Sequence, residues 1–170
     1  MTLDLLKRVL QPIHRRLSLI VTRALVNLVD SEKLMQEIQV QSVGGETLDG
    51  IEHFEPYGYT SRAKQGAEAL LAALGGKRSH LVAVSVADRR FRLKGLAEGE
   101  VAMYTDEGDV IHFKRGNIIE IKAVTKVIID SPTAEFTGTV TAEVDVIAAG
   151  ISLKSHTHPG DSGGSTGPPS

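Results

Sequence analysis

The sequence predicts a mainly β protein with two parts, an N-terminal barrel of the OB type and a C-terminal stem in which three chains intertwine. Three observations lead to this prediction. Short apolar runs separated by glycine and proline turns fill the N-terminal half, a two-residue hydrophobic period fills the C-terminal half, and only 4% of the residues are aromatic. Because a stem so poor in aromatic bulk makes a weak core on its own, we expect partner chains to complete it.

The bulk composition excludes several classes of protein. The chain has 170 residues, which is enough for one or two small domains. A net charge of −2 gives no general attraction to nucleic acid or to anionic membranes. The absence of cysteine excludes disulfides, thiolate metal sites and cysteine nucleophiles. Uncharged runs of the N-terminal segment, such as Leu17 to Thr22, are far shorter than the about 20 residues of a membrane span, so we expect synthesis in the cytoplasm.

Residues 1–17 predict an amphipathic helical segment. Pro12 breaks or bends this helix. Two interpretations remain open: the segment packs on its own domain, or it is a basic helix that docks on a partner or a lipid surface. The apolar side chains recur at helical spacing before the proline, and they are Leu3, Leu5, Leu6, Val9 and Leu10.

Residues 18–98 predict the OB-type barrel. Apolar β-type runs occur near Val21, over 38–40 and over 81–86, and glycine-rich turns such as Gly44-Gly45 lie between them. A short helix is expected over 63–74, since the alanine and leucine residues of that stretch favour helix. Several short strands and one helix in a segment of this length suit an OB fold.

A group of basic side chains lies within this barrel. On an OB barrel such a group could bind single-stranded nucleic acid. The alternative is a solvated rim, which we favour because few aromatic residues interleave with the charges, and no nucleic-acid specificity is expected. The group consists of Lys77, Arg78, His80, Arg89, Arg90, Arg92 and Lys94.

Residues 99–153 predict the stem. Side chains alternate between apolar and polar over 119–129 and again over 136–148, which places every second residue against an apolar interior. The inward residues become smaller toward the C-terminus, from Ile and Phe to Val, Ala and Gly, as a tapering structure requires. Three chains around one axis would pair every strand and bury every apolar face. Half of a β-sandwich or a β-solenoid remains the alternative.

Residues 154–170 predict a metal-binding apex and a tail rich in Gly, Ser and Pro. His156 and His158 are two residues apart, so a single chain supplies only two imidazoles. Three chains would supply six, and an octahedron of nitrogen ligands suits Fe²⁺, with Ni²⁺ or Co²⁺ as substitutes. Strict alternation from Leu153 would turn both histidines outward, so the chain must leave the strand near Lys154. The tail after Gly160 would then cover the tip or fold back along it.

Other interpretations of the histidine pair remain open. The pair could lie in a mobile tail without any metal, or Asp161 could join it in a hydrolytic metal site. A glycine-rich tail provides little preorganisation and no pocket, and the chain contains no Gly-x-Ser-x-Gly, phosphate-binding loop or His-Glu-x-x-His motif. We therefore expect no enzyme. A nucleic-acid-binding OB protein or a trimeric adhesin with a fibrous tail are the alternative functions.

Several stretches, taken in order, resemble the baseplate assembly protein V, or central tail spike, of Mu-like and P2-like contractile phages and tailocins. The stretches are DGIEHFEPYGYTSRAKQGAEAL from Asp49, GEVAMYTDEGDVIHF from Gly99, AAGISL from Ala148, and SHTHPG and GGSTGPP near the end. The resemblance implies a homotrimer with an OB collar, a triple-stranded β-helix, and one iron ion per trimer bound at the tip by His156 and His158 of each chain. It also implies a virion location at the tip of the tail baseplate. The partners would be the hub and tail tube proteins, the target would be the bacterial outer membrane, and further ions could lie inside the needle.

Overall fold

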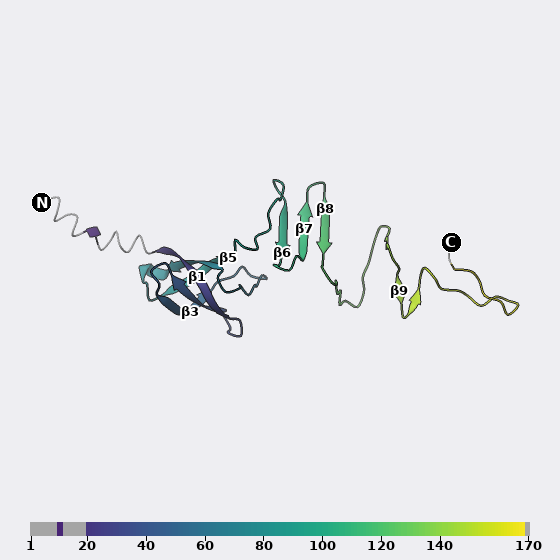
Figure 1. Cartoon of the computed structure of the whole chain (residues 1–170), viewed down its shortest axis with the longest axis horizontal. Coiled ribbons are helices and arrows are strands. Elements are labelled where there is room, and N and C mark those ends of the chain that lie inside the picture. The colour runs from purple at the N-terminus through teal and green to yellow at the C-terminus, as the bar shows by residue number, and fades with distance from the viewer. Residues whose placement is uncertain (1–9, 12–19, 169–170) are drawn as a thin grey trace. The chain divides into compact units, whose positions relative to one another are not determined.

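The computed structural model describes residues 10–11 and 20–168 (Figure 1). The chain divides between Lys126 and Val127 into two compact units, which are described separately below. Apart from Leu10 and Gln11, which are helical, the predicted N-terminal helical segment lies outside the described residues. Within the described part, no helix is long and apolar enough to cross a membrane. The described residues are almost entirely β-strand, turn and extended chain, as predicted.

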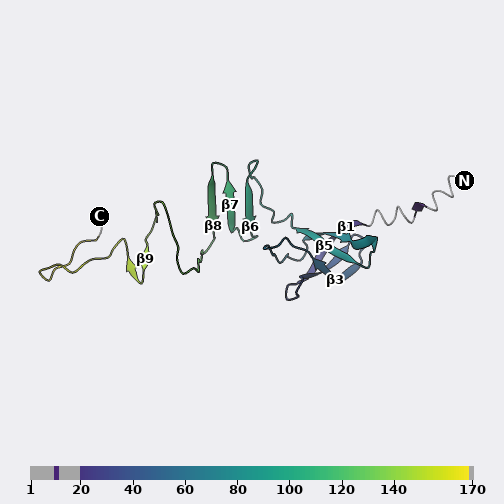
Figure 2. The ribbon, with the colours of Figure 1, turned by 180° about the vertical axis from the view of Figure 1, so that it is seen from behind.

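A closed five-stranded barrel forms the N-terminal part, and both Figure 1 and Figure 2 show its strands wrapped around a common interior. The strand order is β1-β2-β3-β5-β4, and β4 returns to pair with β1. All pairs are antiparallel except β3 with β5. This order and closure are those of an OB-type barrel, so the prediction is confirmed. The strands are β1 (Val21–Asp30), β2 (Glu37–Ser42), β3 (Thr47–His53), β4 (Glu68–Ala73) and β5 (Leu81–Ala87).

The barrel interior is packed with small and medium aliphatic side chains. Leu71 and Val40 are completely buried, and Ile38 and Val26 are 1% exposed. These side chains come from three different strands, and each lies two residues from another buried residue on its own strand. The interior therefore closes around aliphatic residues without an aromatic centre, in keeping with the absence of tryptophan.

The prediction of a helix over residues 63–74 is wrong. The structure has turns up to Gly66, strand β4 over Glu68–Ala73, and a single turn of 3-10 helix over Leu74–Gly76. Gly66 has a positive φ of 86°, which interrupts a right-handed helix, and its amide donates to the carbonyl of Val26 at 2.7 Å. Alternate residues of the segment are buried in the barrel, so pairing with β1 and burial override the weak helix preference of Ala and Leu.

A separate three-stranded antiparallel sheet follows the barrel, with strands β6 (Val101–Tyr104), β7 (Val110–Lys114) and β8 (Ile118–Lys122) in that order. The register places residues of like character on the same face. One face is entirely apolar and largely exposed within the single chain. Its members are Val101, Met103, Ile111, Phe113, Ile119 and Ile121.

The opposite face of this sheet is held by polar contacts. Lys114 forms an ion pair with Glu120 at 2.6 Å. His112 Nε2 lies 3.1 Å from the carboxylate of Glu100, whose side chain is only 11% exposed. The backbone amides of Arg115 and Ala97 donate to the same carboxylate and hold the pKa of Glu100 below its usual value. This face is therefore satisfied within one chain, whereas the apolar face is not.

The remainder of the stem has few contacts within the chain. No strand ladder involves residues 123–146 of the described structure, although their side chains keep the alternating pattern. Large apolar side chains there are open to solvent: Ile129 is 74% exposed and Val144 is 81% exposed. Two short strands, β9 (Ile147–Ala148) and β10 (Ile151–Ser152), then form a hairpin. The predicted boundaries of the stem at residues 99 and 153 stay predictions.

We predict that Leu71→Ala destabilises the barrel by about 2–5 kcal/mol, because the leucine is fully buried and its removal leaves a cavity. Leu70→Ala is the matched control, since this neighbouring side chain points outward and is 40% exposed. It should cost about 1 kcal/mol or less. Hydrogen exchange of the barrel amides in the full chain measures both values locally. Equal effects of the two substitutions would contradict the assigned inward face of β4.

Candidate metal centre

The hairpin before the two histidines is a tight reversal of the chain. Ala149 and Gly150 have φ values of 49° and 83°, which is the pattern of a two-residue type I′ turn. The hairpin is closed by the pairs Ile151 with Ala148 and Ser152 with Ile147. The next backbone hydrogen bond runs from the amide of Leu153 to the carbonyl of Val146, at 2.8 Å. The hairpin therefore presents Leu153 and the following turn at a defined end.

The chain leaves the strand where the sequence requires it to do so. Strand β10 ends at Ser152, and the residues 153–155 form a turn. The amide of His156 donates to the carbonyl of Ser152 at 3.2 Å, which closes the turn. The strict alternation that would have placed the histidines on the outward face is broken here. The departure from strand geometry near Lys154 is thus present in the structure.

The rings of His156 and His158 lie close together in an edge-to-face arrangement. Their centroids are 5.1 Å apart, and their planes meet at 88°. His156 Nδ1 is 2.9 Å from the carbonyl oxygen of Ser152 and 3.2 Å from that of Leu153. Because a carbonyl oxygen only accepts, Nδ1 must carry the proton. The lone pair of His156 is then on Nε2, where it is available to a metal ion.

The tail after the histidines folds back beside His158. The amide of His158 donates to the hydroxyl of Thr166 at 2.9 Å, and the amide of Thr166 donates to the carbonyl of His158 at 2.9 Å. A bridge between Pro159 and Ser165 and a bond from the amide of Gly160 to the carbonyl of Gly164 complete this reversal. The tail forms a local reversal at His158, and its predicted placement over the tip or back along the needle stays a prediction. The backbone of His158 is fixed on both sides by this return.

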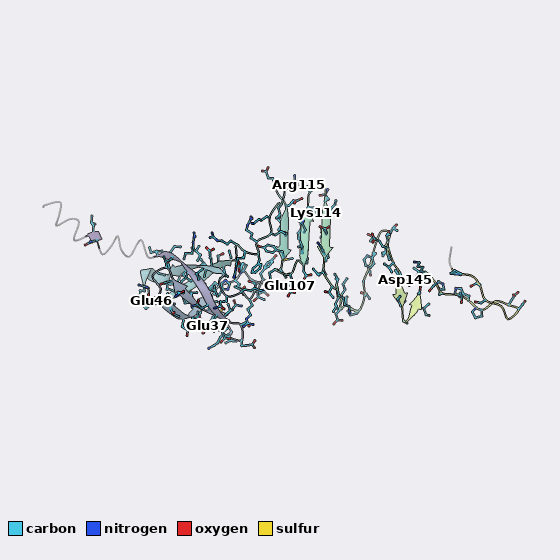
Figure 3. The ribbon with its side chains drawn as sticks, in the orientation of Figure 1. Glu37, Glu46, Glu107, Lys114, Arg115 and Asp145 are labelled. Carbon is cyan, nitrogen blue, oxygen red and sulfur yellow. The ribbon has the colours of Figure 1, made fainter. Side chains whose placement is uncertain are left out.

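One chain does not complete a metal site. Within residues 10–11 and 20–168, no three His, Cys, Asp or Glu side chains are grouped so that they could hold a metal ion. Asp161 therefore does not join the two histidines in the hydrolytic arrangement considered from the sequence. The structure brings together the two predicted ligands and adds the hydrogen bonds that orient one of them. The sequence carries no signal for these orienting hydrogen bonds. It also carries none for the carboxylate of Asp145, labelled in Figure 3, which accepts from the amide of Lys154.

The basic group of the barrel does not form a single groove. Strand β5 divides the group into two sets. The first set, Lys77, Arg78 and His80, precedes the strand and the other four cations follow it, so the length of the strand separates the two sets by roughly 20 Å. Arg78 pairs with Glu46, and Glu46 is labelled on the barrel in Figure 3. Arg89 pairs with Glu68 and Arg90 with Asp88. Three of the seven cations are thus balanced by carboxylates, as on a solvated rim.

Comparisons with known proteins match both ends of the chain and most of its length. The family described as "Bacteriophage Mu Gp45, N-terminal" matches residues 23–90, which hold the five barrel strands, and the "GpV Apex motif" matches residues 150–170. The chain is 34% identical to "Baseplate puncturing device gp45" of Escherichia phage Mu, over 96% of this chain and 95% of that protein. It is also 34% identical to "Mu-like prophage FluMu protein gp45" of Haemophilus influenzae, over 90% of this chain and 93% of that protein.

Proposed function

Because the chain belongs to the family of the phage Mu gp45 baseplate puncturing proteins, we propose that it is a spike that pierces the bacterial outer membrane when a contractile tail fires. Its location is the tail baseplate of the virion, at the tip. As a baseplate component it contacts other baseplate and tail proteins. We assign the contact with the hub and the end of the tail tube to the barrel, which is stable as a closed unit and needs no partner for its own core.

The observation that carries the proposal is the apolar face of the three-stranded sheet. Ile119 is 62% exposed, Ile121 is 60% exposed and Val101 is 61% exposed within a single chain. A contiguous apolar surface of this kind on a virion protein marks an interface. The sheet also ends in two open edges, β6 and β8, whose unpaired backbone groups favour association with further strands.

We infer that this interface joins three copies of the chain. Rotation by one third of a turn brings three apolar faces together around a single axis and closes the edges, so no apolar face remains in water. The stretch 125–145 requires the same solution, since it makes no backbone–backbone hydrogen bond within the described residues and most of its N–H and C=O groups are left without protein partners. An intertwined triple-stranded β-helix pairs this stretch with its copies.

The inferred trimer explains how the stem would transmit force. A needle that is driven through a membrane must resist splaying and bending. Backbone hydrogen bonds between chains and a closed apolar axis would provide this stiffness along the stem. Toward the tip the inward side chains shrink to Ala and Gly, so apolar burial decreases and another interaction must hold the chains together.

A metal ion at the tip would provide that interaction. The residues fit this role, because His156 directs a free Nε2 lone pair away from its hydrogen-bonded Nδ1 and His158 lies beside it on a fixed backbone. Three chains would contribute six imidazole nitrogens, a ligand set that suits Fe²⁺. The ion would link the three chains where their core is thinnest. Any further ions inside the needle have no ligands that we assign.

The trimer is tested by a substitution that is harmless in a monomer. Ile121→Asp places a charge on the apolar face, and Ile118→Asp makes the same change on the opposite face of the same strand, where Ile118 is 56% exposed. We expect wild type and Ile118→Asp to have three times the 18.2 kDa mass of one chain in solution. Ile121→Asp should lose assembly, because a buried unpaired charge costs several kcal/mol. Light scattering measures the mass, and a monomeric wild type at micromolar concentration would refute the stem.

The metal is tested by replacing both histidines. His156→Ala combined with His158→Ala should leave the trimer assembled and remove the tip ion, because the sheet face and the ladder of the stem are untouched. Elemental analysis of protein purified without a histidine tag or a nickel column measures the ion. His80→Ala, at an exposed barrel position, is the control. Unchanged iron in the double variant is incompatible with the assignment.

Piercing is tested in assembled tails that carry a shortened chain. Truncation after Leu153 removes the histidines and the returning tail, and truncation after Gly167 keeps both. Tails with either chain should assemble and contract. The shorter chain should release less of a periplasmic enzyme from sensitive cells, because its tip is no longer held together. Equal release by both truncations would show that the apex has no part in penetration.

A further inference from the structure

The carboxylate of Asp145 joins the two ends of the β9–β10 hairpin. It lies directly before the β9–β10 hairpin, where Figure 3 labels it, and outside residues 150–170 that match the apex motif. Its Oδ1 atom accepts from the amide of Val146 at 2.8 Å and from the amide of Lys154 at 3.1 Å. The amide of Leu153 also donates to the carbonyl of Val146 at 2.8 Å, so side chain and backbone close the hairpin together. Asp145 is half-buried in a stem whose side chains are mostly exposed.

These contacts keep Asp145 ionised. The hydroxyl of Ser152 has the largest effect, and together with the backbone amides of Lys154, Val146 and Leu153 it holds the pKa of Asp145 below its usual value, against a smaller opposing effect of burial. A carboxylate that accepts several N–H and O–H groups is a strong local anchor, because hydrogen bonds to a charged acceptor are about twice as strong as neutral ones. The anchor joins the start of the hairpin to the turn that follows it.

Ser152 lies at the start of the same turn and holds the first histidine. Its hydroxyl oxygen accepts from the amide of Ser155 at 3.0 Å. Its carbonyl receives both the amide of His156 at 3.2 Å and the ring Nδ1–H of His156 at 2.9 Å. The position of Ser152 therefore sets the backbone and the ring of His156. A displaced Ser152 would release both.

We propose that Asp145 is a positioning residue for the apex: by holding the amide of Lys154 it fixes the turn of residues 153–155, and with it His156 in the Nδ1–H tautomer with Nε2 directed outward, ready for a metal ion. The inference rests on the metal site of the proposed function. All of these bonds lie within one chain, so the ligand is oriented before three chains meet. Orientation in advance lowers the entropy lost when the ion binds. Residues that orient a ligating histidine typically contribute about 10- to 100-fold to metal affinity.

The test uses the full-length trimer and Co²⁺ as the probe ion. Asp145→Ala should weaken Co²⁺ binding by about tenfold or more. Ser152→Ala should also lower the Co²⁺ affinity. The double variant should bind Co²⁺ no more weakly than the single variant with the lower affinity, because both residues hold the same turn. Asp161→Ala is the matched control. It removes a carboxylate that is nearer to His158 in sequence and accepts from the hydroxyl of Ser162 at 3.3 Å, and it should change affinity by no more than about twofold.

A second readout needs no metal. Nitrogen NMR of protein with ¹⁵N-labelled histidine distinguishes the two neutral tautomers. Wild type and Asp161→Ala should hold His156 mainly as Nδ1–H. Asp145→Ala and Ser152→Ala should shift it toward the Nε2–H tautomer that free imidazole side chains prefer. A purely structural contribution of Asp145 to stem stability would lower the melting temperature without moving this tautomer.

The outcomes separate the two proposals. Unchanged tautomer and unchanged Co²⁺ affinity in trimeric Asp145→Ala would overturn the positioning role. If Asp145→Ala fails to form trimers, Asp145→Asn decides, since it keeps the shape but loses the charge. A shift toward Nε2–H in that variant supports the inference, and a wild-type tautomer overturns it. If wild type binds no Co²⁺, the metal site of the proposed function is refuted, and the metal-free tautomer comparison still decides whether Asp145 orients His156.

Discussion

The stem presents more apolar surface and more unpaired backbone than a single chain can bury, and this constraint governs the rest of the molecule. On the three-stranded sheet one face carries ion pairs such as Lys114 with Glu120, while the other is formed by six apolar side chains, five of them exposed in the described structure. Beyond Lys122 the chain continues without any ladder until the short hairpin at Ile147. Association of copies is the physical solution that removes both the apolar face and the open edges together.

The barrel, in contrast to the stem, buries its apolar side chains within a single chain. Its five strands close on themselves, so it has no open edge, and its interior is filled by aliphatic side chains of its own, with Leu71 and Val40 completely buried. Such a unit can hold its shape whatever the state of the stem. A self-sufficient collar followed by a stem that depends on its copies suits a baseplate spike, because the collar can meet the tail proteins while the stem is free to form a needle.

Toward the tip, hydrophobic burial gives way to directed polar interactions. The inward residues of the stem become small, and the last ordered elements are a two-residue turn, a three-residue turn and the returning tail. Hydrogen bonds from backbone amides to the side-chain oxygens of Asp145, Ser152 and Thr166 hold these elements in place. They place the two imidazole rings side by side. In the proposed trimer, a shared ion would replace apolar burial where the inward side chains are smallest.

The sequence by itself determined the features that depend on periodicity and on side-chain type. The two-residue period predicted that Ile119 and Ile121 share one face, and the spacing of His156 and His158 predicted that one chain contributes only a pair of ligands. The barrel type was also within reach, because short apolar runs are separated by glycine and proline turns, although the strand β4 was taken for a helix. Local patterns of this kind are written in neighbouring residues, so no tertiary contact is needed to recognise them.

Only the tertiary structure decided features that depend on partners distant in the chain. The segment 63–74 has the composition of a helix, but pairing with β1 makes its second half a strand, and propensity is too weak to resist that pairing. The role of Asp145 was invisible for a related reason. Its partner across the hairpin is the backbone amide of Lys154, which comes within reach only after the hairpin reverses the chain. Backbone amides have no side-chain signature, so a hydrogen bond to one leaves no pattern in a single sequence.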